Sequence, residues 1–219
     1  LLALLDFPEC PKALLAPPLT QSANPAAGAL TLDPALAARL LQRPGGSATW
    51  PDIQALAQQI ALPAGFTVAP LRHADLPLLL AQLPAWFPEL AQGSLAHLLD
   101  GEHYRSAVAL EGEDQTIARR PSIAWVIRRG EELAALCCCS YDIPGYTLRG
   151  ELAVVAPRYR RSGLTQSQLP LAVLVARAIE AETVMSWATL RHPGAQRICE
   201  DAGWQLWGVI PASERYASA

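Results

Sequence analysis

The residues best suited to chemistry lie between positions 154 and 165, where an apolar strand runs through a basic turn into a long apolar helix. The backbone N–H groups at a helix start have no intrahelical partner, and the helix dipole adds partial positive charge there, so an anion completes the hydrogen bonding. Arg160 and Arg161 add fixed charge, and Gly163 lets the backbone approach a bulky pyrophosphate. The alternative is a surface turn whose arginines serve only solubility.

A second segment downstream favours the phosphate-binding interpretation. The run from Arg160 to Thr165 is similar to the acetyl-CoA signature of the GCN5-related N-acetyltransferase (GNAT) family, except that Thr165 stands where Gly or Ala is usual. The run from His192 to Trp204 resembles the family's second cofactor segment, with His192 in place of Asn and Cys199 where Tyr is common. Both segments occur in the family's order. The resemblance covers Gly65 to about Tyr216 and implies an α/β fold with a mixed central sheet flanked by helices.

The resemblance implies acetyl-CoA as the cofactor. Its pantetheine arm would lie between a strand at 151–155 and a strand at 184–189, which splay apart, and its pyrophosphate would rest on the N–H groups from Arg161 to Gln166. The cofactor-binding residues predicted in this way are Val154, Val155, Arg160, Arg161, Ser162, Gly163, Leu164, Thr165, Gln166, His192 and Ala195.

Acetyl transfer to an amine requires a neutral amine, a polarised thioester carbonyl and a proton for the leaving thiolate. Glu151 lies near the position at which many GNAT proteins carry a carboxylate base. The competing interpretation is a surface ion pair between Glu151 and Arg149, worth ~0–1 kcal/mol.

Cys199 occupies the position of the family's usual tyrosine acid. A thiol can donate a proton, although it is a weaker hydrogen-bond donor than a phenol. Cys199 is alternatively a small core residue on its helix, in which case the substitute proton donors are Tyr159, Tyr141 and His192.

The acceptor side of the site is predicted to include the turn from Tyr141 to Tyr146. Asp142 flanked by Tyr141 and Tyr146 suits a cationic amine, although the same residues are also ordinary turn formers. A second polar cluster, His103 to Arg105, has no role that the sequence assigns.

The hydrophobic pattern of the sequence predicts the strands and helices that must position these residues. The sequence predicts strands at 66–71, 123–128, 133–141, 147–155, 184–189 and 204–210, and helices at 74–83, 94–99, 166–180 and 196–202. Gly130-Glu131 predicts a tight hairpin. Pro170 inside the long helix predicts a kink or a delayed start.

Residues 1–62 read differently, with many prolines and two short predicted helices at 34–41 and 51–60. We therefore predict a helical N-terminal extension over 1–62 and a GNAT-like acyltransferase domain over 63–219. Helices this short are marginal alone, so the extension should pack on the main domain or on a second copy, which makes a homodimer one option.

Composition excludes several function classes. A net charge of −3 and a hydrophobic fraction of 51% indicate a globular protein without the extended basic surface that nucleic acid requires. Lys12 is the only lysine, so there is no Walker-type loop, and the dinucleotide, hydrolase-elbow and zincin motifs are also absent. Leu1–Leu5 is too short an apolar run to span a membrane.

The five cysteines are an odd number, which argues against a secreted disulfide framework. The run Cys137-Cys138-Cys139 alternates across a strand and does not present metal ligands at the usual spacings, so no metal site is predicted. We interpret these residues as buried and apolar in a reducing cytoplasm.

Two functions remain open at this stage. One is an acetyl-CoA-dependent N-acetyltransferase that transfers the acetyl group directly to a primary amine of a small molecule or peptide within a ternary complex. The other is a weakly active or inactive protein of the same fold that binds acyl-CoA or a protein partner.

Overall fold

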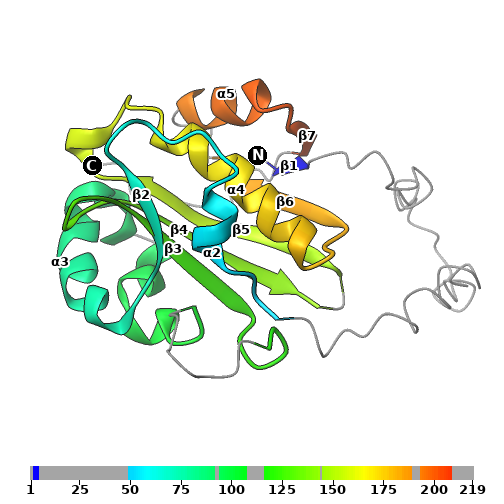
Figure 1. Ribbon diagram of the computed structural model, residues 1–219, viewed down its shortest axis with the longest axis horizontal. Helices are drawn as coiled ribbons and strands as arrows, with labels where there is room; N and C mark the ends of the chain where they lie inside the picture. Colours follow the sequence, from blue (N-terminus) through cyan, green and yellow to red (C-terminus); the bar gives the residue numbers. More distant parts are fainter. Residues whose placement is uncertain are drawn as a thin grey trace, which may run out of the picture.

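The computed structural model describes residues 2–4, 49–91, 94–107, 116–143, 145–188 and 193–208. A seven-stranded mixed sheet runs through it in the order β2-β3-β4-β5-β6-β1-β7 (Figure 1). The strands are β1 (Leu2–Leu4), β2 (Thr67–Pro70), β3 (Ser122–Arg129), β4 (Glu132–Asp142), β5 (Thr147–Val155), β6 (Thr183–Trp187) and β7 (Gln205–Gly208). The pairing of β5 with β6 is parallel, and every other neighbouring pair is antiparallel.

The helices confirm the predicted order of elements. The α-helices are α2 (Ile53–Ala57), α3 (Leu76–Trp86), α4 (Leu164–Ala178) and α5 (Pro193–Asp201), and the 3-10 helices are η2 (His73–Asp75), η3 (Pro88–Ala91), η4 (Ser94–Leu99), η5 (Gly101–Tyr104) and η6 (Pro157–Tyr159). The predicted second helix at 94–99 is a 3-10 turn rather than an α-helix. In Figure 1, α4 crosses in front of the strands with α2 beside it, and it contacts β4, β5 and β6.

The long helix α4 begins before Pro170, without the delayed start that this proline led us to expect. It starts at Leu164 and continues through Pro170 to Ala178, so the expectation of a delayed start is wrong. Its buried residues include Leu164, Leu171 and Val175, which are at most 1% exposed. Burial of this apolar face against the sheet outweighs the single backbone hydrogen bond that proline removes.

The predicted hairpin between β3 and β4 is confirmed. Gly130 adopts φ +59°, a left-handed conformation that glycine accepts without steric cost. The cysteines that follow on β4, Cys137, Cys138 and Cys139, are free and buried, as expected for small apolar core residues. Burial raises the pKa of the Cys138 thiol well above its usual value, so it stays protonated.

The described part of the predicted N-terminal extension contains one strand as well as one helix. Leu2–Leu4 form β1, which pairs antiparallel with both β6 and β7 and so fills the sheet between them. The helix predicted over 51–60 is present but shorter, as α2. Trp50, Ile53 and Ala57 belong to the same buried core as the sheet. The helix predicted at 34–41 lies outside the described residues, and the boundary at residue 62 remains a prediction.

No helix in the ranges that the structure describes combines the length and hydrophobicity needed to cross a membrane. Among the same residues, no group of three or more histidine, cysteine or acidic side chains is arranged to hold a metal ion.

Candidate active site

The central strands diverge halfway along β5. Parallel pairing joins Thr147–Gly150 of β5 to Thr183–Ser186 of β6 and ends there, while β5 continues to Val155. Within the described residues, the β6-facing edge of Glu151–Val155 therefore has no strand partner. This is the divergence that the sequence predicted, and it leaves the backbone of Val154 and Val155 free on one side to bond an extended amide chain.

A β-bulge places Glu151 at the point of divergence. On β4, Cys138 pairs with Leu152 and Cys139 pairs with Gly150, so Glu151 is the extra residue on β5. A bulge bends the strand and redirects one side chain, which is why bulges are frequent beside active sites.

The turn after β5 presents unpaired N–H groups. It runs from η6 into α4 with Arg161 at φ +64° and Gly163 at φ +87°. Among the described residues, the N–H groups of Leu164, Thr165 and Gln166 have no hydrogen-bond partner, whereas the N–H of Ser167 bonds the carbonyl of Gly163 at 3.2 Å. Three unpaired donors at one helix start are the geometry that the predicted anion site requires, and the cofactor roles of these residues remain predictions.

The two arginines of the turn differ in their surroundings. The guanidinium of Arg160 donates to the carbonyl of Trp86, the last residue of α3, and so ties the turn to that helix. Arg161 is exposed and forms no ion pair with any described residue. Arg160 therefore anchors the turn, and Arg161 is the cation left to meet an anion.

The segment just before β2 buttresses the turn. The hydroxyl of Ser167 donates to the carbonyl of Ala61 at 2.9 Å. A Cβ on Gly163 would lie 3.7 Å from Cγ of Pro63 and 3.4 Å from Oε1 of Gln166. The turn is thus held on one side by Ala61, from the predicted extension, with Pro63 beside it.

We expect Gly163→Ala to lower the free energy of unfolding by about 1–2 kcal/mol, because its φ of +87° is left-handed and costs an L-residue about that much. Urea denaturation measures the difference. Gly194→Ala is the matched control, because a Cβ there meets nothing within 4 Å and the site is helical. An unchanged midpoint for Gly163→Ala would contradict the left-handed turn.

Gln168 supplies an independent indication of a polar ligand near the helix start. It lies on α4 one residue beyond Ser167, is 2% exposed, and neither side-chain amide atom has a hydrogen-bond partner. Buried amide groups are nearly always satisfied, so an orphaned one indicates a missing partner. The donors of the turn, the free edge of β5 and this amide together fit a cofactor with a pyrophosphate and an arm bearing amides.

Glu151 pairs with a histidine. Nε2 of His103, on η5, lies 3.6 Å from Oε2 of Glu151, whose side chain is 30% exposed. Hydrogen bonding to His103, with a further bond to Ser140, lowers the pKa of the Glu151 carboxyl despite its partial burial. The predicted ion pair between Glu151 and Arg149 is wrong: Arg149 pairs with Asp142 at 2.7 Å, seven residues back across the hairpin.

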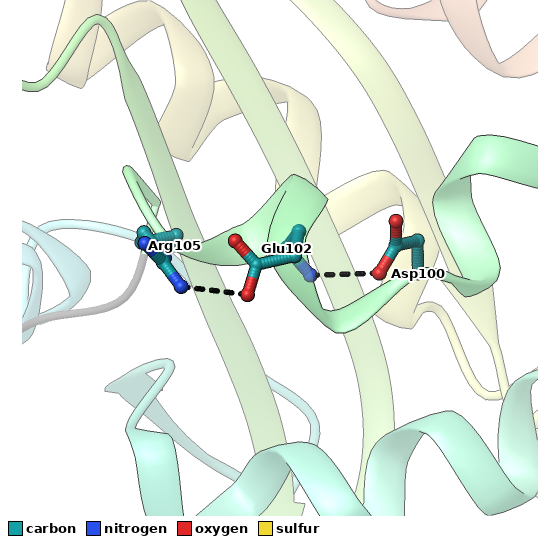
Figure 2. A network of polar contacts seen from close by, with 3 residues as sticks. All are labelled: Asp100, Glu102 and Arg105. Carbon is teal, nitrogen blue, oxygen red and sulfur yellow. Dashed lines mark hydrogen bonds and ion pairs between the residues drawn. The ribbon is translucent and has the colours of Figure 1, made fainter.

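Local hydrogen bonds fix the turn that carries His103. Figure 2 shows Asp100 accepting from the N–H of Glu102 at 3.0 Å and Glu102 bonded to Arg105 at 2.7 Å. Tyr104, which follows His103 in the chain, is fully buried, and its hydroxyl donates to the carbonyl of Leu98 at 2.8 Å. Burial raises the pKa of Tyr104, which therefore stays neutral. His103 also contacts His97, with ring centroids 5.0 Å apart.

His103 is the functional candidate that the sequence did not assign. No spacing rule links a histidine in a 3-10 turn to a glutamate on a strand far along the chain. The polarity of the His103 to Arg105 run was the only signal, and surface residues give the same signal.

The predicted acceptor residues lie at the hairpin between β4 and β5. Tyr141 is buried, and the carbonyl of Tyr146 accepts from the N–H of Glu182 at 2.8 Å. The carboxylate of Asp142 is paired with Arg149. These contacts stabilise the hairpin, and the acceptor role of the three residues remains a prediction.

The candidate proton donors are dispersed. Cys199 is half-buried on α5, and burial raises the pKa of its thiol, which stays protonated at neutral pH. Tyr159 bonds Glu132, at the opposite end of β4 from the hairpin with Asp142. His192, the other substitute donor, lies outside the described residues. Ala195, a predicted cofactor-binding residue, is exposed on α5.

Comparisons with known proteins show the fold. Spermidine N-acetyltransferase from Vibrio cholerae, solved with CoA and spermine, matches with a TM-score of 0.54 and 14% identity over 70% of this chain and 88% of that chain. AAC(6')-Iy, solved with the bisubstrate analogue CoA-S-monomethyl-acetylneamine, matches with a TM-score of 0.51 and 12% identity over 66% of this chain and 94% of that chain. A transcriptional regulator from Bacillus halodurans matches with a TM-score of 0.52 and 13% identity over 66% and 96%. No family model and no curated protein matches the sequence.

The chain therefore has the fold of the GCN5-related N-acetyltransferases, with the mixed sheet and flanking helices that the sequence predicted. At these identities the likeness concerns the fold and leaves the activity to be argued from the site.

Proposed function

We propose that the protein is an N-acetyltransferase that transfers the acetyl group of acetyl-CoA to a primary amine. The observation that carries the proposal is the juxtaposition of three features: a free strand edge, a carboxylate at the bulge where that edge begins, and a helix start with three N–H groups unpaired among the described residues. Two solved proteins of the same fold support the assignment of the cofactor: the spermidine N-acetyltransferase holds CoA, and AAC(6')-Iy holds a bisubstrate analogue that contains CoA.

The chain's own groups suit the binding of the cofactor. Leu164, Thr165 and Gln166 would donate their N–H groups to the pyrophosphate, with Arg161 adding charge. Val154 and Val155 would bond the pantetheine arm along the free edge of β5, and the amide of Gln168 is available to it. When bound, acetyl-CoA supplies an acyl thioester.

Glu151 is the proposed base. Transfer forms a C–N bond to the amine and breaks the C–S bond of the thioester, the amine loses a proton and the thiolate gains one. Because its pKa is lowered, Glu151 is ionised at neutral pH and available to accept the amine's proton, directly or through a water. His103 holds the carboxylate in place and is a positioning residue.

Cys199 is the proposed proton donor. We expect Cys199→Ala to lower kcat by about tenfold or more while the Kd for acetyl-CoA stays the same. This effect is smaller than the ~10²–10⁴-fold typical of general acid catalysis because a thiol is a weak hydrogen-bond donor. Turnover is measured by thiol release and the Kd by calorimetry. Unchanged turnover would leave Cys199 with a packing role only.

The test of the proposed function begins with calorimetric titration of the purified protein with acetyl-CoA and, separately, with CoA. Micromolar binding followed by thiol release in the presence of polyamines, aminoglycosides or peptide amines would support the enzyme. Binding without turnover on any acceptor would favour the alternative, an inactive protein of this fold. Absence of binding would contradict the cofactor assignment.

The remaining proposals concern the setting of this activity. A small-molecule or peptide amine as acceptor, a homodimer, the absence of nucleic acid and membrane partners, and residence in the cytoplasm all stay proposals. Size-exclusion chromatography with light scattering decides the oligomeric state.

A further inference from the structure

A pocket of about 290 Å³ lies at the edge of the sheet. It is separate from the turn between β5 and α4 that carries Arg160, Arg161 and Gly163, called the phosphate turn below. It forms where β2 leaves the sheet after Pro70, so that the first residues of β3 are flanked by other segments. On β3, the N–H of Ala124 bonds the carbonyl of Ala107 at 3.1 Å. Trp50, which precedes α2, also lines the pocket.

Arg120 is the unusual residue of this pocket. It is 8% exposed, and its guanidinium has no hydrogen-bond or ion-pair partner within the described ranges, with Nη1 fully inaccessible to solvent. Burying a guanidinium without a partner is costly, and the cost is relieved when an anion pairs with it. An unpaired buried arginine that lines a pocket therefore indicates a site for an anionic group.

The backbone around Arg120 is held firmly. Its N–H bonds the carbonyls of Thr116 and Ile117 at 3.0 and 3.1 Å, and its carbonyl accepts from Nε1 of Trp50 at 2.6 Å. Thr49 and Thr116 form an isolated antiparallel bridge beside it. The backbone that carries Arg120 is thus fixed before a ligand arrives, which lowers the entropic cost of binding.

The rest of the lining defines the class of ligand. Trp50, Ile53, Pro70 and Ile123 supply apolar surface, and the hydroxyls of Ser106 and Ser122 add donors. Asp52 also lines the pocket, and its negative charge disfavours a dianion such as phosphate. One cation, one carboxylate and two hydroxyls among mainly apolar side chains suit a monoanion with an apolar body.

We propose that this pocket binds a small organic monocarboxylate, with its carboxylate on Arg120 and its apolar body against Trp50 and Ile123. The position is distinct from the phosphate turn. Ile123, Cys139 and Gly150 lie in one row across β3, β4 and β5, so the pocket is two strand spacings, or about 10 Å, from the bulge at Glu151. The site does not depend on acetyl-CoA binding.

The test is calorimetric titration of the full chain with sodium phenylacetate and sodium hexanoate. The neutral controls are phenylacetamide and hexanamide, and inorganic phosphate is the dianion control. We expect at least one carboxylate to bind, and its amide and phosphate to bind at least tenfold more weakly. Absence of carboxylate binding, equal binding of the amide or tighter binding of phosphate would each overturn the proposal.

Substitution locates the site. We expect Arg120→Met to weaken carboxylate binding at least tenfold and to melt no lower than the wild type in ligand-free buffer, because it removes an unpaired buried charge. Arg119→Met, which removes a neighbouring exposed arginine, should bind like the wild type. If Arg120→Met does not fold, Arg120→Lys replaces it and should still weaken binding, because an ammonium lacks the planar fork. Unchanged binding by the Arg120 variant overturns the proposal.

A final variant distinguishes a free ligand from the chain's own acids. Glu111, Glu113 and Asp114 are close to Arg120 in the sequence. If the triple variant Glu111→Gln, Glu113→Gln, Asp114→Asn binds carboxylate and the wild type does not, the native occupant is an acid of this chain and the proposal is wrong. Equal binding by both proteins supports it.

Discussion

Glu151→Gln is expected to lower kcat by about 100-fold or more while leaving the Kd for acetyl-CoA unchanged. The amide keeps the size of the side chain at the bulge but cannot accept a proton, and general base catalysis commonly contributes ~10²–10⁴-fold. Steady-state thiol release with a responsive amine measures kcat, and calorimetry measures the Kd.

Glu102→Gln is the matched control for this experiment. It removes a carboxylate from the 3-10 turn that carries His103 but keeps the backbone N–H of Glu102 that bonds Asp100. Among the described residues its side chain, 67% exposed, pairs with Arg105 at the surface, and glutamine can still accept that bond. Wild-type turnover is expected for it. A Glu151→Gln variant with wild-type turnover would exclude Glu151 as the base and restrict it to a structural pair with His103.

The lowered pKa of Glu151 sets its pH behaviour. A carboxyl whose folded pKa lies below its unfolded value contributes stability above the unfolded pKa, and that stability is lost as pH falls through the folded pKa. Glu151 therefore stays ionised throughout the neutral range. A fall in kcat/KM on acidification that begins above about pH 5 must therefore come from another group. Below that pH, the free energy of unfolding should fall less steeply for Glu151→Gln than for the wild type.

Thr165→Pro is expected to weaken acetyl-CoA binding by about 10- to 100-fold, as loss of one hydrogen bond to a charged group costs about 1.5–3 kcal/mol. Thr165 is the second residue of α4, and its N–H has no intrahelical acceptor, so proline removes a ligand donor without breaking the helix. The chain itself tolerates this arrangement, because α3 begins with Leu76-Pro77.

Thr165→Ala is the matched control for the proline variant. It keeps the N–H group and removes the branched side chain at the position where the family has Gly or Ala, so its Kd for acetyl-CoA should equal or improve on the wild-type value. Urea denaturation of both variants checks that folding is retained. A Thr165→Pro variant that binds acetyl-CoA like the wild type would contradict the pyrophosphate assignment.

The local geometry of the turn before α4 was easier to predict from the sequence than the contacts of Glu151. The phosphate turn is local, since the order of strand, Gly163 and helix start defines it over a few residues. The partners of Glu151 are not local, and the predicted pair with Arg149 failed because the bulge at Glu151 separates the two side chains and Asp142 lies closer across the hairpin.

The extension shows the same division. The prolines and short helical patterns of residues 1–62 predicted a region unlike the rest, but they carried no sign that Leu2–Leu4 pair with β6 and β7. Three apolar residues are too few to show a periodicity that distinguishes a strand from a loop. They form a strand because the edges of two distant strands are available for them to pair with.

The sequence by itself determined the order of strands and helices, the hairpin at Gly130, the buried cysteines of β4 and the glycine-bearing turn at the start of α4, because each depends on interactions between near neighbours. The tertiary structure alone decided that His103 meets Glu151, that Arg160 is held by the end of α3, and that Arg120 is buried without a partner. Those outcomes depend on which distant segments pack together, and hydrophobic burial is not directional enough to specify that from the pattern of the chain.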